Sequence, residues 1–175
     1  MKPIGLLALG SLLAFWATPS FAQYKHHDWS TALGDDKRSV YASNVNSDGS
    51  VLMETCSTNT KSCTWLLGGN TKCDKGMTAP ALVNADNYAG TINLKCEGEV
   101  AKDLYSYSFS DWKTLESLIK DSKSVGIAVA IGNTQFKVYR FSLFGMTEAQ
   151  KDAEQVFEIM LDNEASTPKS GNSIL

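Results

Sequence analysis

The two histidines are the first residues with chemical potential, because His26 and His27 are adjacent and the chain has no others. They stand in the segment Lys-His-His-Asp-Trp, where two imidazoles and the carboxylate of Asp28 could bind a divalent metal. The same residues also fit a solvated arm that leads to Trp29, so the metal stays an alternative and no cofactor is predicted. A Ser-His-Asp or Cys-His mechanism would need its base from this segment, so no catalytic residue is assigned.

Paired carboxylates are the other catalytic chemistry that the composition allows, with one acid as proton donor and the other as base or nucleophile. Nothing in the sequence selects two acids as such a pair. A small carboxylate-dependent hydrolase is therefore kept as an alternative. The candidate acids are Asp35, Asp36, Glu54, Asp86, Glu97 and Asp103.

The segment 44–50, Asn-Val-Asn-Ser-Asp-Gly-Ser, resembles a calcium loop because side-chain oxygens alternate before a glycine. The twelfth position requires a bidentate Glu, but Thr55 stands there and Glu54 comes one residue early. A hairpin turn at 46–49 explains the same residues without a metal. The glycines at 68–69 lack the Lys-Ser/Thr ending of a phosphate loop and indicate a turn.

The four cysteines, Cys56, Cys63, Cys73 and Cys96, predict two disulfides, since their number is even and the chain carries an export signal. A zinc site is the alternative, but the CxxC spacing that zinc sites prefer is absent. Three pairings are open. We favour Cys56–Cys63 with Cys73–Cys96, because each bond then closes a local loop.

The N-terminal segment predicts export. Lys2 precedes an apolar run at 4–16, and a Thr-Pro break leads to small residues at Ser20 and Ala22. This is the order of a secretory signal peptide, and the run is shorter than the roughly 20 residues that span a bilayer. We expect a signal peptide at 1–22, a periplasmic or secreted mature protein, and no stable membrane insertion after cleavage. The alternative is an uncleaved anchor.

The elements that must position these residues are mostly short strands. Alternating apolar residues predict strands at 38–44, 50–56, 63–67, 81–84, 91–96, 104–109, 125–131 and 135–143, with a hairpin around 132–133. Ser110 is expected to cap a helix that has Trp112, Leu115, Leu118 and Ile119 on one face. Thr147 and Gln150 predict a capping box for a C-terminal helix.

The fold expected is predominantly β, a β-sandwich or barrel-like domain of about eight short strands, stabilised by disulfides. It carries two helices, one after residue 110 and one C-terminal. A single domain is expected at 23–162, followed by a flexible tail at 163–175.

One stretch, 138–149, has the sequence Val-Tyr-Arg-Phe-Ser-Leu-Phe-Gly-Met-Thr-Glu-Ala. It resembles the closing signature of the invasion-associated locus B family, in which a Ser-Leu-x-Gly segment precedes a helix. An early tryptophan, here Trp29, and a cysteine-containing middle are similar, while the cysteine spacing departs from that family. The resemblance implies a secreted or periplasmic bacterial β-rich domain and supplies no catalytic residues.

We expect a non-enzymatic exported binding protein with a protein partner. This expectation depends on the missing catalytic motif, the formal net charge of −3 and the rigid scaffold. The negative charge argues against nucleic acid. The most concrete version is an inhibitor or immunity-type protein that docks onto an exported enzyme or toxin. The alternative is a secreted virulence or host-invasion factor. The oligomeric state is left open.

The partner is expected to contact three polar loops, at 57–62, 68–72 and 84–90. The partner-binding residues proposed from these loops are Asn59, Lys61, Asn70, Lys72, Asp86 and Tyr88.

Overall fold

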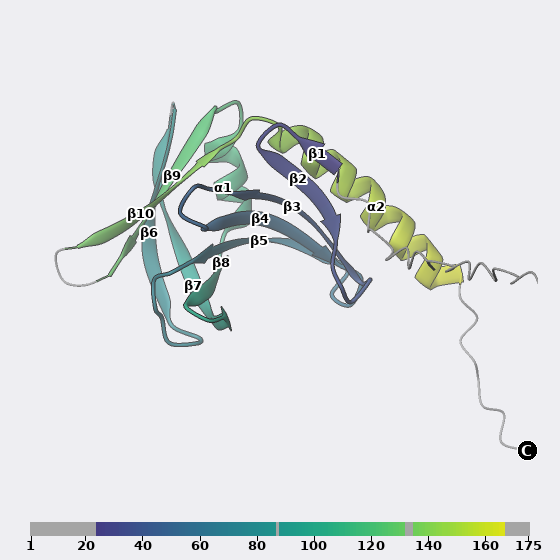
Figure 1. Ribbon diagram of the computed structural model, residues 1–175, viewed down its shortest axis with the longest axis horizontal. Helices are drawn as coiled ribbons and strands as arrows, with labels where there is room; N and C mark the ends of the chain where they lie inside the picture. Colours follow the sequence, from purple (N-terminus) through teal and green to yellow (C-terminus); the bar gives the residue numbers. More distant parts are fainter. Residues whose placement is uncertain (1–23, 87, 132–134, 167–175) are drawn as a thin grey trace, which may run out of the picture.

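The computed structural model describes residues 24–86, 88–131 and 135–166. They form one antiparallel sheet of ten strands in the order β1-β2-β3-β4-β5-β8-β7-β6-β9-β10, together with two helices (Figure 1). The prediction of a predominantly β fold with two helices and disulfides is confirmed. The expected signal peptide at 1–22 and the hairpin tip at 132–134 lie outside the described residues.

The eight expected strands are all present, and β1 and β2 are two that the sequence analysis missed. The strands are β1 Tyr24–His26, β2 Trp29–Leu33, β3 Ser39–Val45, β4 Val51–Ser57, β5 Ser62–Gly69, β6 Thr78–Ala85, β7 Ala89–Ala101, β8 Leu104–Phe109, β9 Ser124–Ala130 and β10 Phe136–Ser142. The helices are α1 Trp112–Ile119 and α2 Met146–Ser166.

The sheet buries one face, because inward-facing residues of its strands are apolar at every second position. Its largest fully buried side chains include Trp29, Trp65, Tyr139 and Phe141. In Figure 1 the strands β3 to β5 run across the view, whereas β6 and β7 run steeply. The sheet therefore bends around its own core as a single layer instead of forming two stacked sheets.

The bend brings the last strand back towards β3. The side-chain amide of Asn44 donates to the carbonyl of Ser142 over 3.1 Å, and that of Asn46 donates to the carbonyl of Arg140 over 3.2 Å. The hairpin turn between β3 and β4 is confirmed, with a backbone bond from Asn46 to the carbonyl of Ser50 and a positive φ of 80° at Gly49. The two asparagines of the calcium-like segment thus join β10 to this hairpin.

Both helices cover the inward-facing side of the sheet. On α2, Ala149, Ala153 and Phe157 are buried, and the Thr31 hydroxyl of β2 donates to the Ala149 carbonyl over 2.8 Å. On α1, the buried residues are Leu115 and Ile119. The outer face of the sheet is covered by neither helix.

The expected helix caps are wrong. Asp111 caps α1 by accepting from the Thr114 N–H over 3.1 Å, since the N–H of Ser110 is still bonded to the Asn93 carbonyl of the sheet. Helix α2 begins at Met146, one residue before Thr147. The Gln150 amide donates to Glu54 over 2.8 Å, so it does not close a capping box.

Helix α2 continues to Ser166, four residues beyond the expected domain end at 162. The Thr58 hydroxyl donates to the Glu164 carboxylate over 2.7 Å, which ties this last turn to the β4–β5 hairpin. The remainder of the expected tail, 167–175, lies outside the described residues. Within the described ranges, neither helix has the length and apolar character needed to cross a membrane.

The favoured disulfide pairing is confirmed. Cys56 and Cys63 are directly opposed on β4 and β5, and their bond crosses between the two strands. The bond between Cys73 and Cys96 ties the segment before β6 to β7. Glu54 lies beside the first disulfide, but thiols joined to each other do not serve as thiolate ligands for a metal.

Candidate functional site

The outer face of β6, β9 and β10 carries large apolar side chains that solvent reaches. Phe136 is 64% exposed, Leu82 50% and Val138 41%. The strand register places them together, because Leu82 and Val138 both stand opposite Ala128, and Phe136 stands opposite Ala130. We call these five residues the apolar strip. Exposed apolar residues that form a continuous patch, unlike isolated ones, are typical of interaction surfaces.

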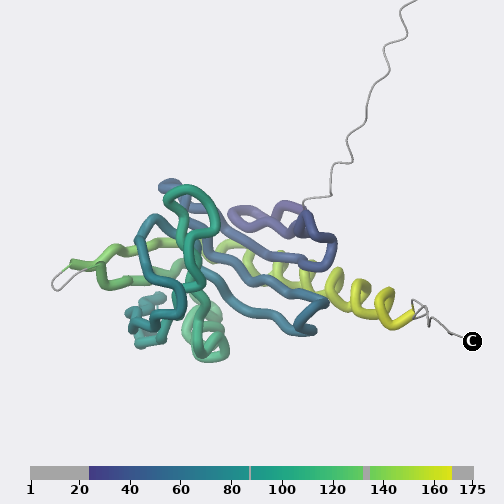
Figure 2. Tube along the Cα trace, turned by 90° about the horizontal axis from the view of Figure 1, so that it is seen from below, coloured from purple at the N-terminus to yellow at the C-terminus, as the bar shows by residue number. Residues whose placement is uncertain are grey.

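The apolar strip lies on β6 and on the two strands of the β9–β10 hairpin. Figures 1 and 2 both show the β9–β10 hairpin extending away from the body of the domain, on the side opposite the end of α2. Ile131, directly after β9, is also 49% exposed. The strip is therefore accessible to a large partner.

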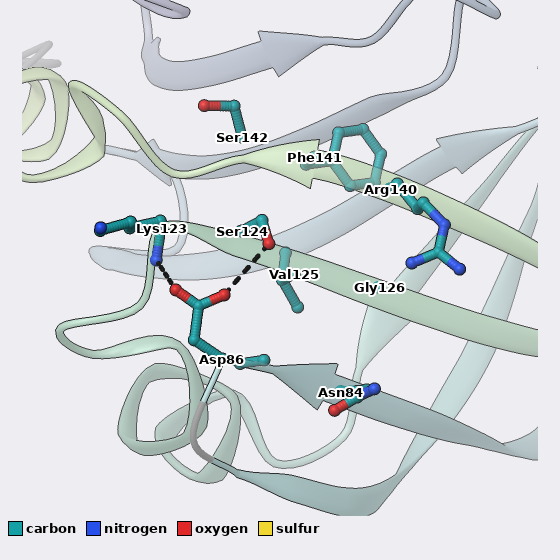
Figure 3. A pocket seen from close by; sticks show the side chains of 10 residues that line it. Asn84, Asp86, Lys123, Ser124, Val125, Gly126, Arg140, Phe141 and Ser142 are labelled. Atoms are coloured by element: carbon teal, nitrogen blue, oxygen red, sulfur yellow. Dashed lines mark hydrogen bonds between the residues drawn. The ribbon is translucent and has the colours of Figure 1, made fainter.

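A groove adjoins the apolar strip in the next row of the sheet. Asn84 of β6 and Arg140 of β10 both stand opposite Gly126 of β9, which has no side chain to fill the space between them (Figure 3). The cavity has a volume of about 570 Å³ and continues to Lys123, Ser124 and Ser142. We call it the Arg140 groove.

In the Arg140 groove the carboxylate of Asp86 has hydrogen-bond partners within the protein, whereas the guanidinium of Arg140 is in no salt bridge among the described residues. Both oxygens of Asp86 accept hydrogen bonds, one from the Lys123 N–H over 2.7 Å and one from the Ser124 hydroxyl over 3.2 Å. Three salt bridges join described residues, and Arg140 takes part in none of them. Its exposed guanidinium can therefore donate hydrogen bonds to a carboxylate of another molecule.

A second groove, of about 770 Å³, lies between α1 and α2. We call it the helix groove. Glu116, Gln150 and Glu154 line it together with the buried Trp65, whose indole N–H donates to Glu116 over 3.2 Å. Lys113, Lys120 and Lys151 are also in its lining.

Glu54 lies next to this groove and is the one buried charged residue of the described chain, at 6% exposure. Burial raises the pKa of its carboxyl, and the charges of Glu116 and Glu154 raise that pKa further, while the hydrogen bond from Gln150 opposes them. A carboxyl with a raised pKa can act as a proton donor. Gln150 stands between it and the groove, since Gln150 both lines the groove and binds Glu54.

The six residues proposed from the three loops are not brought together. The 58–61 turn lies by the end of α2, through Thr58 and Glu164, whereas Thr71 contacts Tyr139 of β10. Asp86 lies at the Arg140 groove, the only one of the six with a place in either groove as described above. Exposed side chains are present at all six positions, Asn59, Lys61, Asn70, Lys72, Asp86 and Tyr88.

The histidines belong to a packed N-terminal hairpin, not to a solvated arm. His26 of β1 lies 2.7 Å from the Asp152 carboxylate of α2, measured from Nε2 to Oδ2. The ring of His27 stacks on Phe144, with centroids 3.7 Å apart. The two imidazoles thus contact different neighbours, and metal binding by them stays the untested alternative.

The apolar strip was not located from the sequence, because alternation along a strand does not tell which apolar face stays uncovered. One signal was present. In β10 the outward positions Phe136 and Val138 are apolar as well as the inward positions Tyr139 and Phe141. A strand that is apolar on both faces has to be covered on both or to expose one.

No protein-family profile and no curated protein matches this chain. Its fold is similar to that of a solved structure, the crystal structure of invasion associated protein B from Bartonella henselae, with a TM-score of 0.55 and 13% sequence identity. The match covers 78% of this chain and 99% of that one. At this identity the likeness is one of fold, and it agrees with the fold that the 138–149 stretch implied.

Proposed function

We propose that the protein is an exported, non-enzymatic binding protein that docks a protein partner through the apolar strip. The single observation that carries this proposal is the clustering of Leu82, Phe136 and Val138, exposed by 41–64%, on the outer face of β6 and the projecting β9–β10 hairpin, which neither helix covers. Aromatic and aliphatic anchors of this kind contribute most of the energy of protein interfaces. The predicted signal peptide and the two disulfides support work outside the cytoplasm.

Two kinds of partner are compatible with such a face. The similar structure carries the name of an invasion-associated protein, which supports a secreted virulence factor that acts on a host surface. The inhibitor or immunity-type protein, with an exported enzyme or toxin as partner, is the alternative. Both use the same face, so one experiment separates them.

The experiment is site-specific photocrosslinking. A photoreactive phenylalanine replaces Phe136, and in a control protein it replaces Val45, which is 63% exposed at the end of β3. Each protein is irradiated with intact mammalian cells and, separately, with the periplasmic extract of the source bacterium. We expect one discrete adduct from position 136 and none from position 45.

The adduct must also disappear when Leu82→Ser is added, because that change removes an anchor beside the crosslinker. An adduct on the cells favours the host-surface version, and one in the extract favours the inhibitor version. Equal labelling from both positions, or no adduct in either setting, overturns the docking proposal.

The second candidate function is a carboxylate-dependent hydrolase at the helix groove. The observation that favours it is the raised pKa of buried Glu54 next to Glu116. Hydrolysis of polysaccharide substrates by the purified protein, lost in Glu54→Gln and in Glu116→Gln, would support it. Absence of turnover across glycan and peptidoglycan substrates removes it.

A further inference from the structure

We infer that the Arg140 groove is a carboxylate-recognition subsite, which takes an acidic side chain of the protein segment that docks on the apolar strip. This inference rests on the proposed function and deepens it by naming the chemistry of the partner. The occupant to which it commits is an extended segment with an apolar residue and an acidic residue two positions apart.

The charges of the groove favour an acidic occupant. Lys123 and Arg140 line it, and its one carboxylate, Asp86, already accepts two hydrogen bonds from the protein. The guanidinium of Arg140 is thus left with donors that no carboxylate of the described residues engages in a salt bridge. A formal net charge of −3 makes such a cationic hollow unlike the chain as a whole.

The shape of the groove gives the carboxylate a place beside that guanidinium. A Cβ atom added at Gly126 would lie 3.6 Å from Nη1 of Arg140 and 3.8 Å from Cγ1 of Val138. The glycine therefore forms the floor between the groove and the apolar strip. Asn84, on the other side of Gly126, offers a side-chain amide to the same hollow (Figure 3).

The distance between Val138 in the apolar strip and Arg140 in the groove predicts the sequence pattern of the partner segment. Val138 and Arg140 are two residues apart on β10 and face the same side, so about 6.6 Å separates their Cα atoms. An extended partner segment has the same repeat. An apolar residue over Val138 thus places an acidic residue, two positions along, over Arg140.

The edge of β10 shows how the segment lies. The carbonyls of Arg140 and Ser142 point away from β9 and already accept from Asn46 and Asn44. A partner strand cannot pair with carbonyls that are so covered. The segment therefore lies along β10 on the outer face of the sheet and does not extend the sheet edge at Arg140 and Ser142.

The test uses NMR titration of the ¹⁵N-labelled mature protein with three short peptides. They are acetyl-Phe-Ser-Glu-amide, its Gln counterpart and its Lys counterpart. We expect the Glu peptide to shift the amide signals of Gly126, Arg140 and Val138 saturably, with an affinity at least fivefold above that of the Gln peptide. The Lys peptide should bind more weakly still.

Two variants locate the effect. Arg140→Gln should abolish the preference for the Glu peptide over the Gln peptide. Gly126→Ala should weaken binding of the Glu peptide, because the methyl group fills the hollow. The added Cβ would meet its neighbours at an ordinary 3.6–3.8 Å, so the fold should be kept. Lys113→Gln, in the helix groove, is the matched control and should leave the preference unchanged. Unchanged preference in Arg140→Gln overturns the inference.

A titration with inorganic phosphate tests whether the groove binds phosphate instead of a carboxylate. If phosphate shifts the same signals and displaces the Glu peptide at equal concentration, the groove is a phosphate site and the inference is wrong. Failure of the carboxylate subsite can be distinguished from failure of the proposed docking function. If Leu82→Ser removes the crosslinked adduct and Arg140→Gln does not, docking on the strip stands and the carboxylate subsite falls.

Discussion

Tyr139 of β10 occupies the space that a side chain at Gly69 of β5 would fill, since a Cβ atom there would lie 2.6 Å from the phenol ring. The two strands are far apart in the order of the sheet, so this contact holds the bend closed over the core. The Tyr139 hydroxyl accepts from the Thr71 N–H over 3.1 Å, and the Tyr107 hydroxyl donates to the Thr71 carbonyl over 2.6 Å. Burial, with Tyr139 and Tyr105 nearby, raises the pKa of Tyr107 to about 12.

Gly69→Ala should lower the free energy of unfolding by about 1–3 kcal/mol, because the buried ring of Tyr139 has to move to make room for the methyl group. Urea denaturation followed by tryptophan fluorescence measures the change. Gly68→Ala is the matched control, because its Cβ would meet Val51 at an ordinary 3.5 Å. Equal stability of the two variants would contradict this account of the bend.

The two disulfides should differ in their contribution to stability. On the chain-entropy treatment, the bond between Cys56 and Cys63 contributes about 2.5 kcal/mol and the bond between Cys73 and Cys96 about 3.4 kcal/mol, since the second closes a longer loop. Double Cys→Ser variants unfolded in urea at pH 7 give both values. A larger loss for the shorter loop would show that strain or residual structure, not loop length, sets the order.

Glu54→Gln should stabilise the protein at pH 8, by on the order of 1 kcal/mol. The pKa of Glu54 is raised in the folded state, chiefly by burial, so the wild type is favoured below the unfolded pKa and loses stability as the pH rises through the folded pKa. The gain should therefore shrink at pH 4. The amide oxygen still accepts from Gln150, so the hydrogen bond is kept.

Thermal unfolding of Glu54→Gln and wild type at pH 4, 6 and 8 measures this dependence. Glu158→Gln, an exposed position on α2, is the control and should change little at any pH. A Glu54→Gln variant less stable than wild type at pH 8 would mean that the ionised carboxylate is stabilised in the fold.

Much of this fold could be predicted, because the signals for its turns, disulfide loops and strands come from residues close together in the sequence. The hairpin turn at 46–49, the two short disulfide loops and the alternation of β3 to β10 each depend on neighbours within about 25 residues. Strands β1 and β2 were missed because distant contacts order them, such as that between His26 and Asp152, 126 residues apart. The cap of α1 was misplaced by one residue, because the N–H of Ser110 is still bonded to the Asn93 carbonyl of the sheet.

The candidate site could not be predicted, because alternation does not say which face of a strand the helices will cover. Phe136 and Val138 have the residue types of a core. Their exposure follows from both helices packing on the inward face, and the Arg140 groove follows from a three-strand register at Gly126. The polar loops at 57–62, 68–72 and 84–90 were predicted as the contact region instead, and they lie against different parts of the structure.

Docking through the apolar strip is tested most directly by a binding isotherm of the labelled mature protein on the partner surface that the crosslinker identifies. The variant Leu82→Ser/Phe136→Ser/Val138→Ser is compared with Val45→Ser/Val100→Ser, whose replaced residues are 63% and 61% exposed elsewhere. We predict at least a tenfold loss of affinity for the strip variant, unchanged affinity for the control, and native circular dichroism for both. Equal affinity of the two variants would contradict the claim.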